Sequence, residues 1–478
     1  MNQKLLLPLW AHQQAAINKA LNKFALFFDP GCGKTRTALE LFKKQFDATA
    51  NKHNYYKCII FAPLNVCRNW VTEIERYVDR TQYDYEIFLC AGQNKATKLK
   101  AIREFSKFSD KPNPKPKFLV CNIETIRGPY YLAALKESRC NFIIADESHN
   151  FKNPTSLQTK GLIEIVEYMR ATHVYLLTGT PCPSGEIDLW STFRLLGVTR
   201  DSFFIWRKKY FEDYNARRAG TSGYYPDYRV KESSKKVFAE QLARCSITAR
   251  KDEVLDLPEY VRTNIYCELS DTQRRHYKTM REFLFAADDN GNEATAQNIL
   301  TRTLRLQQIV GGWLEDNVIV DNKRLDVLND AIDMIELNEP GAQFIVWTIF
   351  KPTYKQLSEL LAKRSISHEF LTGEQTAEAR AKNIEDFQAG KLKALIAHPK
   401  AGGVGVNLTA ASWSIHYLKN FSLTDDLQSE ARNYRGGSEI HKRITRIDIV
   451  AQDTIDEDIN EALSQKKSLQ EFIMGIKK

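Results

Sequence analysis

A glycine-rich turn near the start of the chain carries the residue types that bind a phosphate chain. Gly31-Cys32-Gly33-Lys34-Thr35 follows the apolar run Phe24–Phe28, which predicts a buried strand. Backbone N–H groups of such a turn point at a phosphate, and the ammonium group of Lys34 can reach the outer phosphates. The hydroxyl of Thr35 is placed for Mg²⁺. The turn is therefore predicted to bind a nucleotide and its metal ion.

A second apolar run ends in two carboxylates that can complete this chemistry. Phe142–Ala145 is followed by Asp146, Glu147, Ser148 and His149. We expect Asp146 to bind Mg²⁺ and Glu147 to handle the attacking water. The pairing, the order and the spacing of the two segments predict a nucleoside triphosphatase that uses ATP and Mg²⁺.

The composition is that of a globular protein with several domains. Of the 478 residues, 43% are hydrophobic and 27% are charged, and the chain is too long for one core. The sequence has neither an apolar run long enough to cross a membrane nor the pattern of a secretory signal. The nine cysteines never form a Cys-x-x-Cys pair, which argues for reduced thiols and against a zinc module. We therefore expect a cytoplasmic protein without membrane contact.

The net charge is +9, and part of it gathers in one segment. Between Phe203 and Lys251, Lys and Arg outnumber Asp and Glu, and Arg207, Lys208 and Lys209 are consecutive. The same segment holds the aromatic residues Trp206, Tyr210, Phe211, Tyr224, Tyr225 and Tyr228. Cations bind phosphates and aromatic rings stack on unpaired bases, so this mixture suits a nucleic acid. The alternative is a solvated helical face over a small aromatic core.

The order of apolar and amphipathic segments predicts an α/β fold in two halves. The predicted strands of the first half are Phe24–Asp29, Cys58–Ala62, Phe118–Cys121, Phe142–Asp146 and Val174–Thr178, with helices over Thr35–Phe46 and Asn69–Tyr77. The helices Asp271–Ala287 and Glu293–Ile309 precede the strands Phe344–Trp347, Ala394–Ala397, Trp413–Tyr417 and Ile444–Val450. Strands that alternate with helices form parallel sheets covered on both faces.

The second half has two further signals of a site. Three glycines lie close together at Gly402, Gly403 and Gly405, where a backbone can pass close to a phosphate or to a facing domain. Farther on, Gln428, Arg432 and Arg435 are spaced so that they share one face of a helix. We expect these three residues to act in catalysis, because an arginine that contacts a transferring phosphoryl group accelerates hydrolysis.

With these motifs in place, nearly the whole chain resembles the superfamily 2 helicases, and among them the Swi/Snf-type DNA translocases. The matching motifs are, in chain order, Leu9-Trp10-Ala11-His12-Gln13, Pro30–Thr35, Phe61–Leu64 with Asn69-Trp70, Asp146–His149, Leu177–Pro181 with Asp188-Leu189-Trp190, Ile247–Pro258, Leu269–Gln273, Phe344–Trp347, Ala401–Leu408, Gln428–Arg435 and Thr454–Glu457. The resemblance implies two RecA-like α/β domains with a helical and irregular insertion between them, and with the nucleotide in the cleft between the domains. We expect the first RecA-like domain over 1–200, the basic-aromatic insertion over 201–262, a helical segment over 263–330 and the second RecA-like domain over 331–478.

The resemblance also implies roles for single residues. Gln13 would read the adenine, and Gly405 would add to the nucleotide site. Contacts with nucleic acid are implied for Pro63, Asn69, Thr178, Thr180 and Asn407, to which the charge pattern adds Arg207, Lys208 and Lys209.

The leading prediction is an ATP-dependent DNA helicase or translocase that remodels branched DNA, such as forks and four-way junctions. Because the sequence ends soon after the last motif, we expect a compact monomeric motor that is similar to the branch-migration and fork-remodelling helicases, including those of tailed phages. Its partner would be branched or double-stranded DNA, bound through phosphates with weak sequence preference. Three alternatives stay open: a duplex translocase that displaces bound protein, an RNA helicase, and a DNA-binding scaffold with a degenerate ATP site.

Overall fold

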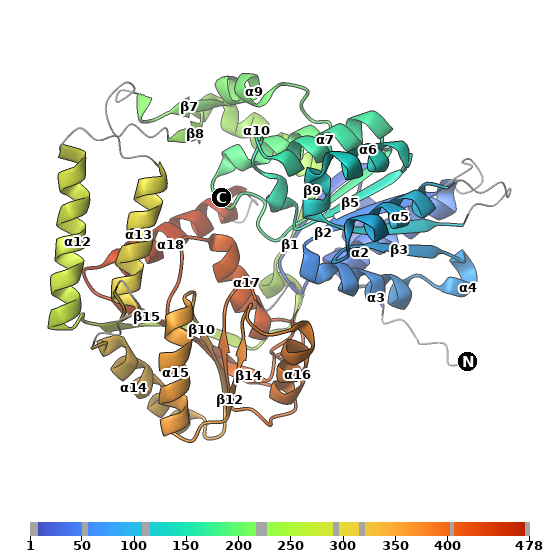
Figure 1. Cartoon of the computed structure of the whole chain (residues 1–478). Coiled ribbons are helices and arrows are strands. Elements are labelled where there is room, and N and C mark those ends of the chain that lie inside the picture. The colour runs from blue at the N-terminus through green and yellow to red at the C-terminus, as the bar shows by residue number, and fades with distance from the viewer. Residues whose placement is uncertain are drawn as a thin grey trace. The chain divides into compact units, whose positions relative to one another are not determined.

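The protein is built of two units, each on its own parallel sheet (Figure 1). The computed structural model describes residues 8–49, 56–107, 115–216, 227–289, 296–314, 321–401 and 406–473. Most residues up to Leu255 belong to the first unit, and most residues from Asp256 to Ser468 belong to the second. No helix in the described ranges is both long and apolar enough to cross a membrane.

The sheet of the first unit has seven parallel strands in the order β3-β4-β2-β5-β6-β1-β9. The strands are β1 (Lys23–Phe28), β2 (Lys57–Ala62), β3 (Glu86–Cys90), β4 (Lys117–Asn122), β5 (Phe142–Asp146), β6 (His173–Leu177) and β9 (Ser246–Ala249). The helices of this part of the chain are α1 (Ala11–Lys19), α2 (Lys34–Thr49), α3 (Cys67–Tyr77), α4 (Arg80–Tyr83), α5 (Lys95–Ser106), α6 (Pro129–Glu137), α7 (Leu157–Met169), α8 (Leu189–Leu195), α9 (Phe203–Tyr210), α10 (Lys235–Cys245) and α11 (Lys251–Val254). A small two-stranded sheet joins β7 (Phe211–Asp213) to β8 (Tyr228–Val230).

Helices cover both faces of this sheet (Figure 1). Almost every residue of the inner strands is buried, because successive side chains point to opposite faces and each face meets apolar helices. On one face the ring of Phe42, on α2, lies 4.7 Å from that of Phe118 and 5.1 Å from that of Phe142. On the other face α5, α7 and their neighbours join one hydrophobic cluster, with Phe105 and Leu162 as members.

Two strands of the first sheet depart from the pattern that the sequence predicts. At the edge of the sheet, β3 carries the apolar run Ile87–Cys90 but is only partly buried, since it pairs with a strand on one side alone. From within the basic-aromatic segment, β9 returns to the sheet and pairs with β1, with Ala25 opposite Ser246. The segment after Leu196 is therefore partly strand and partly helix, and it adds a strand to the first sheet.

The sheet of the second unit has six parallel strands in the order β10-β15-β14-β11-β13-β12. Its strands are β10 (Glu259–Cys267), β11 (Gln343–Trp347), β12 (His368–Leu371), β13 (Ala394–Ala397), β14 (Ala411–His416) and β15 (Arg443–Ala451). Its helices are α12 (Asp271–Asp289), α13 (Ala296–Val310), α14 (Lys323–Asn338), α15 (Lys351–Lys363), α16 (Ala377–Gln388), α17 (Leu423–Asn433) and α18 (Ile455–Ile473). The two parallel sheets and their flanking helices confirm the predicted α/β fold.

A buried arginine ties the elements of the second unit together. Arg324, on α14, is 1% exposed. Its guanidinium group donates to the carbonyl oxygens of Tyr417 and Ile449 and to the carboxylate of Asp456. One side chain thus links α14 to the chain that follows β14, to β15 and to the start of α18.

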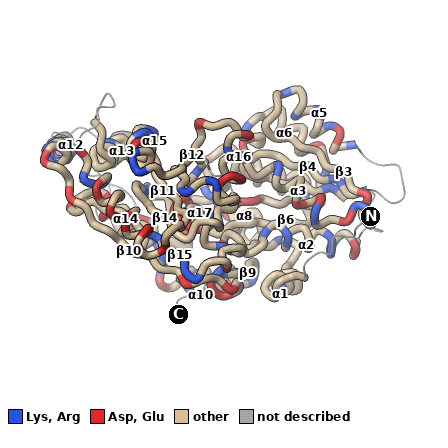
Figure 2. The backbone as a smooth tube through the Cα atoms, turned by 90° about the horizontal axis from the view of Figure 1, so that it is seen from below, with Lys and Arg blue, Asp and Glu red and all other residues tan. Residues whose placement is uncertain are grey.

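Charged residues are spread over the molecule. In Figure 2 the Lys and Arg positions are interspersed with Asp and Glu along the backbone of both units. All nine cysteines fall in the described ranges, where each is a free and buried thiol.

Candidate active site

The glycine-rich turn lies between β1 and α2, at the carboxyl end of the strand. Gly31 and Gly33 adopt the left-handed φ values of 93° and 77°, which residues with a Cβ rarely adopt. A Cβ at Gly33 would lie 2.2 Å from Nε2 of Gln13. The turn leads directly into α2, whose first residue is Lys34, so the free N–H groups of a sixteen-residue helix face the same side.

The predicted adenine reader is held against this turn. Gln13 is 1% exposed; its Oε1 accepts the backbone N–H of Trp10 at 2.9 Å, and its Nε2 donates to the carbonyl oxygen of Gly33 at 3.3 Å. A ring nitrogen of His12 lies 2.9 Å from the carbonyl oxygen of Cys32. The start of α1 and the glycine-rich turn therefore form one hydrogen-bonded assembly.

Asp146 ends β5 as a buried carboxylate with both oxygens in use. Its Oδ2 accepts the indole N–H of Trp70 at 2.9 Å, and its Oδ1 accepts the backbone N–H of Glu147 at 2.9 Å. Burial, and then the negative charge of Glu147, raise the pKa of Asp146 to about 6, while the Trp70 hydrogen bond and the charge of Lys34 oppose the rise. Lys34 therefore lies close enough to act on Asp146.

Glu147 and His149 connect this strand end to the next one. Glu147 has a left-handed backbone with φ 47°, and its Oε2 lies 3.3 Å from Nδ1 of His149. The same His149 nitrogen is 3.0 Å from the hydroxyl of Thr178 and 3.2 Å from the hydroxyl of Thr180. Both threonines follow β6 and are buried. The segments after β5 and β6 thus share one polar network.

The segment after β6 also touches the glycine-rich turn. A Cβ at Gly179 would lie 3.0 Å from Cδ of Pro30 and 3.1 Å from the carbonyl oxygen of Phe28. The amino group of Lys34 donates to that same carbonyl oxygen at 2.9 Å. The residues after β1, β5 and β6 therefore lie together at one edge of the sheet, where parallel strands place their carboxyl ends.

These residues fit a nucleotide with a metal ion. The cradle of the turn has room only for glycine at position 33, and the lysine and the helix start bring positive charge to it. Thr35 and Asp146 offer a hydroxyl and a carboxylate, the oxygen donors that Mg²⁺ uses together with phosphate oxygens.

Asp29, just before the turn, ties it to the chain that leaves the first unit. Its carboxylate accepts the backbone N–H of Lys251 at 3.1 Å, and its own N–H donates to the carbonyl oxygen of Ala249 at 2.9 Å. Burial raises the pKa of Asp29, and the hydrogen bond from Lys251 opposes the rise. The backbone N–H and the carboxylate of Asp29 thus each make a hydrogen bond to the chain at the end of β9 and just after it.

The predicted arginines of the second unit lie in different environments. Arg432 is on α17 and is 4% exposed. The helix ends at Asn433, before Gly436 and Gly437, so the prediction that Arg435 shares a helical face with Gln428 is wrong. Arg435 is half-buried beyond the helix, and its guanidinium group donates to the carbonyl oxygen of Val406 at 3.4 Å.

A buried cluster of charged residues contacts α17. Arg446, on β15, contacts Asp426 on α17, and its Nε donates to Asp448 at 2.8 Å. Lys419 and Arg262 also donate to Asp448, at 3.0 Å and 2.6 Å. These cations hold the pKa of Asp448 well below its usual range. The sequence gives a signal for this cluster only in retrospect, as two charges two residues apart in an apolar strand.

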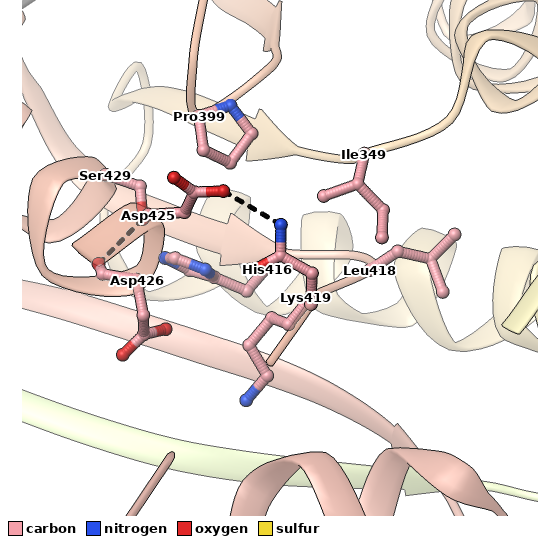
Figure 3. A pocket seen from close by; sticks show the side chains of 9 residues that line it. Ile349, Pro399, His416, Leu418, Lys419, Asp425, Asp426 and Ser429 are labelled. Atoms are coloured by element: carbon pink, nitrogen blue, oxygen red, sulfur yellow. Dashed lines mark hydrogen bonds between the residues drawn. The ribbon is translucent and has the colours of Figure 1, made fainter. Parts of the chain in front are cut away.

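A small hollow adjoins this cluster at the carboxyl ends of β11, β13 and β14 (Figure 3). Its polar lining includes His416, Lys419, Asp425 and Ser429. The hydroxyl of Ser429 donates to the carbonyl oxygen of Asp426 at 2.8 Å. His416 is buried, and its Nε2 has no hydrogen-bond partner among the described residues. Burial, and then the charge of Arg446, lower the pKa of His416 to about 3, so the ring is neutral in the folded protein.

Comparison with known protein families identifies the family of this chain. The model of the SNF2-related domain matches residues 17–311, which is more than half of the chain. The chain belongs to the SNF2-related family. The model of the helicase conserved C-terminal domain matches residues 323–437. The predicted resemblance to Swi/Snf-type members of superfamily 2 is therefore confirmed.

Relatives share this core at low identity. An uncharacterized ATP-dependent helicase of Mycoplasma genitalium is 25% identical over 94% of this chain and 40% of its own length. Human chromodomain-helicase-DNA-binding protein 1 is 24% identical over 95% of this chain and 26% of its own length. The chain thus spans less than half of these relatives. The solved SWI2/SNF2 ATPase core of Sulfolobus solfataricus in complex with dsDNA is 22% identical, with a TM-score of 0.43, over 98% of this chain and 93% of that chain.

In this SNF2-related chain the predicted nucleic-acid contacts fall in several places. Asn69, at the start of α3, is exposed, and Pro63, just after β2, is half-buried. Asn407 is exposed, and its side-chain oxygen accepts the N–H of Thr409 at 3.1 Å. Thr178 and Thr180 are instead buried beside His149. Gly405, Tyr224 and Tyr225 lie outside the described residues.

The basic-aromatic segment combines a core with an exposed surface. Trp206 is fully buried, and its ring lies 4.9 Å from that of Phe211. On the same helix Phe204 is 65% exposed, and the guanidinium group of Arg207 lies over the rings of Phe204 and Tyr228, at 5.4 Å and 4.3 Å. Lys208 and Lys209 are exposed. The aromatic core of the alternative interpretation is present around Trp206, and nucleic-acid binding by the exposed side chains stays a prediction.

The buried neutral imidazole of His416 predicts an acid-sensitive second unit. The pKa of His416 is 6.5 in the unfolded chain and about 3 in the folded protein. As the pH falls below 6.5, the imidazole therefore takes up a proton in the unfolded chain but not in the folded one, and the free energy of unfolding decreases until the pH reaches about 3. Between about pH 7.5 and about pH 5, this group should remove on the order of 2 kcal/mol of unfolding free energy.

Denaturant unfolding of wild type and His416→Gln at both pH values measures this loss. The wild type should lose more stability than His416→Gln, whatever the absolute stability of the variant. His276→Gln, at an exposed histidine of α12, should keep the wild-type dependence. An unchanged pH dependence in His416→Gln would contradict the prediction.

Proposed function

We propose that the chain is an ATP-dependent DNA translocase that remodels branched DNA. The observation that carries the proposal is the meeting of three segments at the carboxyl edge of the first sheet, with the charge of Lys34 acting on the buried Asp146. This arrangement suits phosphoryl transfer, in which the protein contributes positioning and electrostatic stabilisation. Membership of the SNF2-related family supports the coupling of that reaction to DNA.

The proposed roles follow the geometry of the first unit. The turn and Lys34 hold the phosphates, Thr35 and Asp146 hold Mg²⁺, and Gln13 recognises the base beside the turn. Bound ATP supplies the phosphoanhydride bond whose hydrolysis drives movement. Glu147 holds the proton of the attacking water, and His149 fixes the Glu147 carboxylate 3.3 Å away while it contacts the threonines after β6.

The arginines of the second unit are proposed to stabilise the transferring phosphoryl group. Arg435 is the better candidate of the two, because it is half-buried and lies beyond the end of α17, whereas Arg432 is 4% exposed within the helix. The cluster around Arg446 would hold α17, and so Gln428, in place.

The preference for branched DNA rests on the basic-aromatic segment. Phe204 and Arg207 form an exposed surface that pairs an aromatic ring with a cation. A junction offers unpaired bases that can stack on such a ring, at roughly 1–3 kcal/mol per base, and an intact duplex does not. A plain duplex translocase is the second candidate, favoured by the names of relatives such as the ISWI chromatin-remodeling complex ATPase of Saccharomyces cerevisiae.

Hydrolysis measured on a panel of nucleic acids tests the function. ATP turnover should be low alone and should rise with DNA, more with forks and four-way junctions than with linear duplex, and least with RNA of the same length. Equal stimulation by linear and branched DNA favours the plain duplex translocase. Stimulation by RNA alone favours an RNA helicase, and no turnover on any substrate favours a scaffold.

The carboxylate of Glu147 should be required for hydrolysis and dispensable for binding. Glu147→Gln keeps the shape of the side chain but cannot accept a proton from water, so turnover should fall by about a hundredfold or more. Titration with a fluorescent ATP analogue should show wild-type affinity. Glu164→Gln, the same change at a surface residue of α7 that pairs with Lys136, should be silent. Near-normal hydrolysis by Glu147→Gln would remove the proposed role.

The cations of α9, half-buried at Arg207 and exposed at Lys208 and Lys209, should contribute to DNA affinity. Reversal of charge at Arg207, Lys208 and Lys209 should weaken binding and flatten its salt dependence, by about 0.9 in the logarithmic slope for each DNA phosphate that the variant no longer neutralises. The matched control reverses Lys363, Lys391 and Lys442, three exposed lysines that precede strands of the second unit. Equal effects of the two triple variants would show that only net charge matters.

A further inference from the structure

The indole of Trp70 joins the start of α3 to the proposed metal ligand. Trp70 is 1% exposed, and its N–H donates to Oδ2 of Asp146 at 2.9 Å. Trp70 lies on α3 and Asp146 ends β5, so this bond spans two elements that are far apart in sequence. Hydrogen bonds to a buried carboxylate are among the stronger ones in proteins.

This bond fixes the direction of the carboxylate. The other oxygen, Oδ1, accepts the backbone N–H of Glu147 at 2.9 Å, so each oxygen has its own donor. The backbone donor belongs to the strand end itself and moves with it. The indole donor belongs to a helix, so a shift of α3 changes the position of Oδ2 while Oδ1 stays anchored.

The same helix start carries exposed side chains. Arg68 and Asn69 are exposed and precede Trp70 directly, and Leu64 beside them is 53% exposed. Cys67 anchors the turn before them, with its Sγ 3.4 Å from the carbonyl oxygen of Pro63. A cation and an amide on this exposed turn suit the phosphodiester backbone of a nucleic acid.

We propose that Trp70 is a positioning residue that transmits the binding of a nucleic-acid backbone at Arg68 and Asn69 to Asp146, and so to metal and nucleotide. This inference rests on the proposed function and names its regulation. When a nucleic-acid backbone binds the exposed side chains of this helical turn, the position of the indole on the buried side of the same turn is fixed. By linkage, nucleotide with metal must then strengthen DNA binding by the same factor by which DNA strengthens nucleotide binding.

Two substitutions separate the hydrogen bond from packing. Trp70→Phe keeps a large ring and loses the donor. Trp70→His loses the six-membered ring but keeps an N–H where the indole N–H lies, because Nε2 of imidazole and Nε1 of indole occupy equivalent ring positions. The control is Trp347→Phe, since Trp347 is also fully buried, in the second unit, and its indole nitrogen has no hydrogen-bond partner in the described part of the chain.

The first measurement is the coupling between two ligands at equilibrium. The affinity for linear duplex DNA is measured with and without Mg²⁺ and a non-hydrolysable ATP analogue. The ratio of the two affinities should fall roughly tenfold in Trp70→Phe, and it should be retained in Trp70→His and Trp347→Phe. The affinity for DNA alone should stay at the wild-type value in all three variants.

The second measurement needs neither nucleotide nor metal. The seven tryptophans are replaced biosynthetically by 5-fluorotryptophan, and the ¹⁹F resonances of Trp70 and Trp347 are assigned by their loss in the Phe variants. Duplex DNA alone should shift the Trp70 resonance and leave that of Trp347 in place. This readout stays informative even where Trp70→Phe is too unstable for the binding assay, since Trp70→His then provides the assignment.

The outcomes separate this inference from the proposed function. A wild type that neither hydrolyses ATP nor binds nucleotide contradicts the proposed function. A wild type with DNA-stimulated hydrolysis, but with unchanged coupling in Trp70→Phe or a Trp70 resonance that ignores DNA, overturns the inference alone. Equal loss of coupling in the Phe and His variants also overturns it, because the indole would then act through packing.

Discussion

Parallel strand pairing is the constraint on which the first unit depends. Strands that run the same way bring all their carboxyl ends to one edge, and each connection must cross back over a helix. The turn after β1, the carboxylates after β5 and the threonines after β6 meet for this reason, although they are far apart in the chain. A shift of one strand against its neighbour would move its carboxyl end by about 3.3 Å per residue, so the register of the sheet sets the distances among Lys34, Asp146 and His149.

Each unit buries a carboxylate, and the pKa values of the two carboxylates are shifted in opposite directions. Asp448 is surrounded by Arg446, Lys419 and Arg262, and its pKa is pushed well below the usual range. Asp146 meets only neutral donors directly, and burial raises its pKa to about 6. A carboxylate that is surrounded by fixed cations has a structural role, since its charge is already balanced within the protein. A buried carboxylate that is hydrogen-bonded only to neutral donors among the described residues can still take a cation from solution as a ligand.

The sequence predicts the inner strands well and the contacts between elements poorly. Runs such as Phe142–Asp146 are apolar throughout because both faces of the sheet are covered, and that signal is local. The edge strand β3 carries the apolar run Ile87–Cys90 and is nevertheless absent from the predicted strands, while in β9 the polar Ser246 and Thr248 interrupt the signal. Lys34, Asp146 and Glu147 can be predicted as a group because the spacing of their motifs is typical of a nucleoside triphosphatase. The Trp70–Asp146 bond and the Arg446 cluster are not found, because they depend on which helix packs over which strand end.

The pairing of β9 with β1 has a mechanical consequence. The polypeptide runs from β9 through α11 into β10, which is the first strand of the second sheet along the chain. Asp29 is hydrogen-bonded to residues on this route, at Ala249 and Lys251, immediately before the glycine-rich turn begins. The start of the connection between the units is therefore hydrogen-bonded to the residue that lies just before the glycine-rich turn. Asp29 joins the two, through its backbone N–H on one side and its carboxylate on the other.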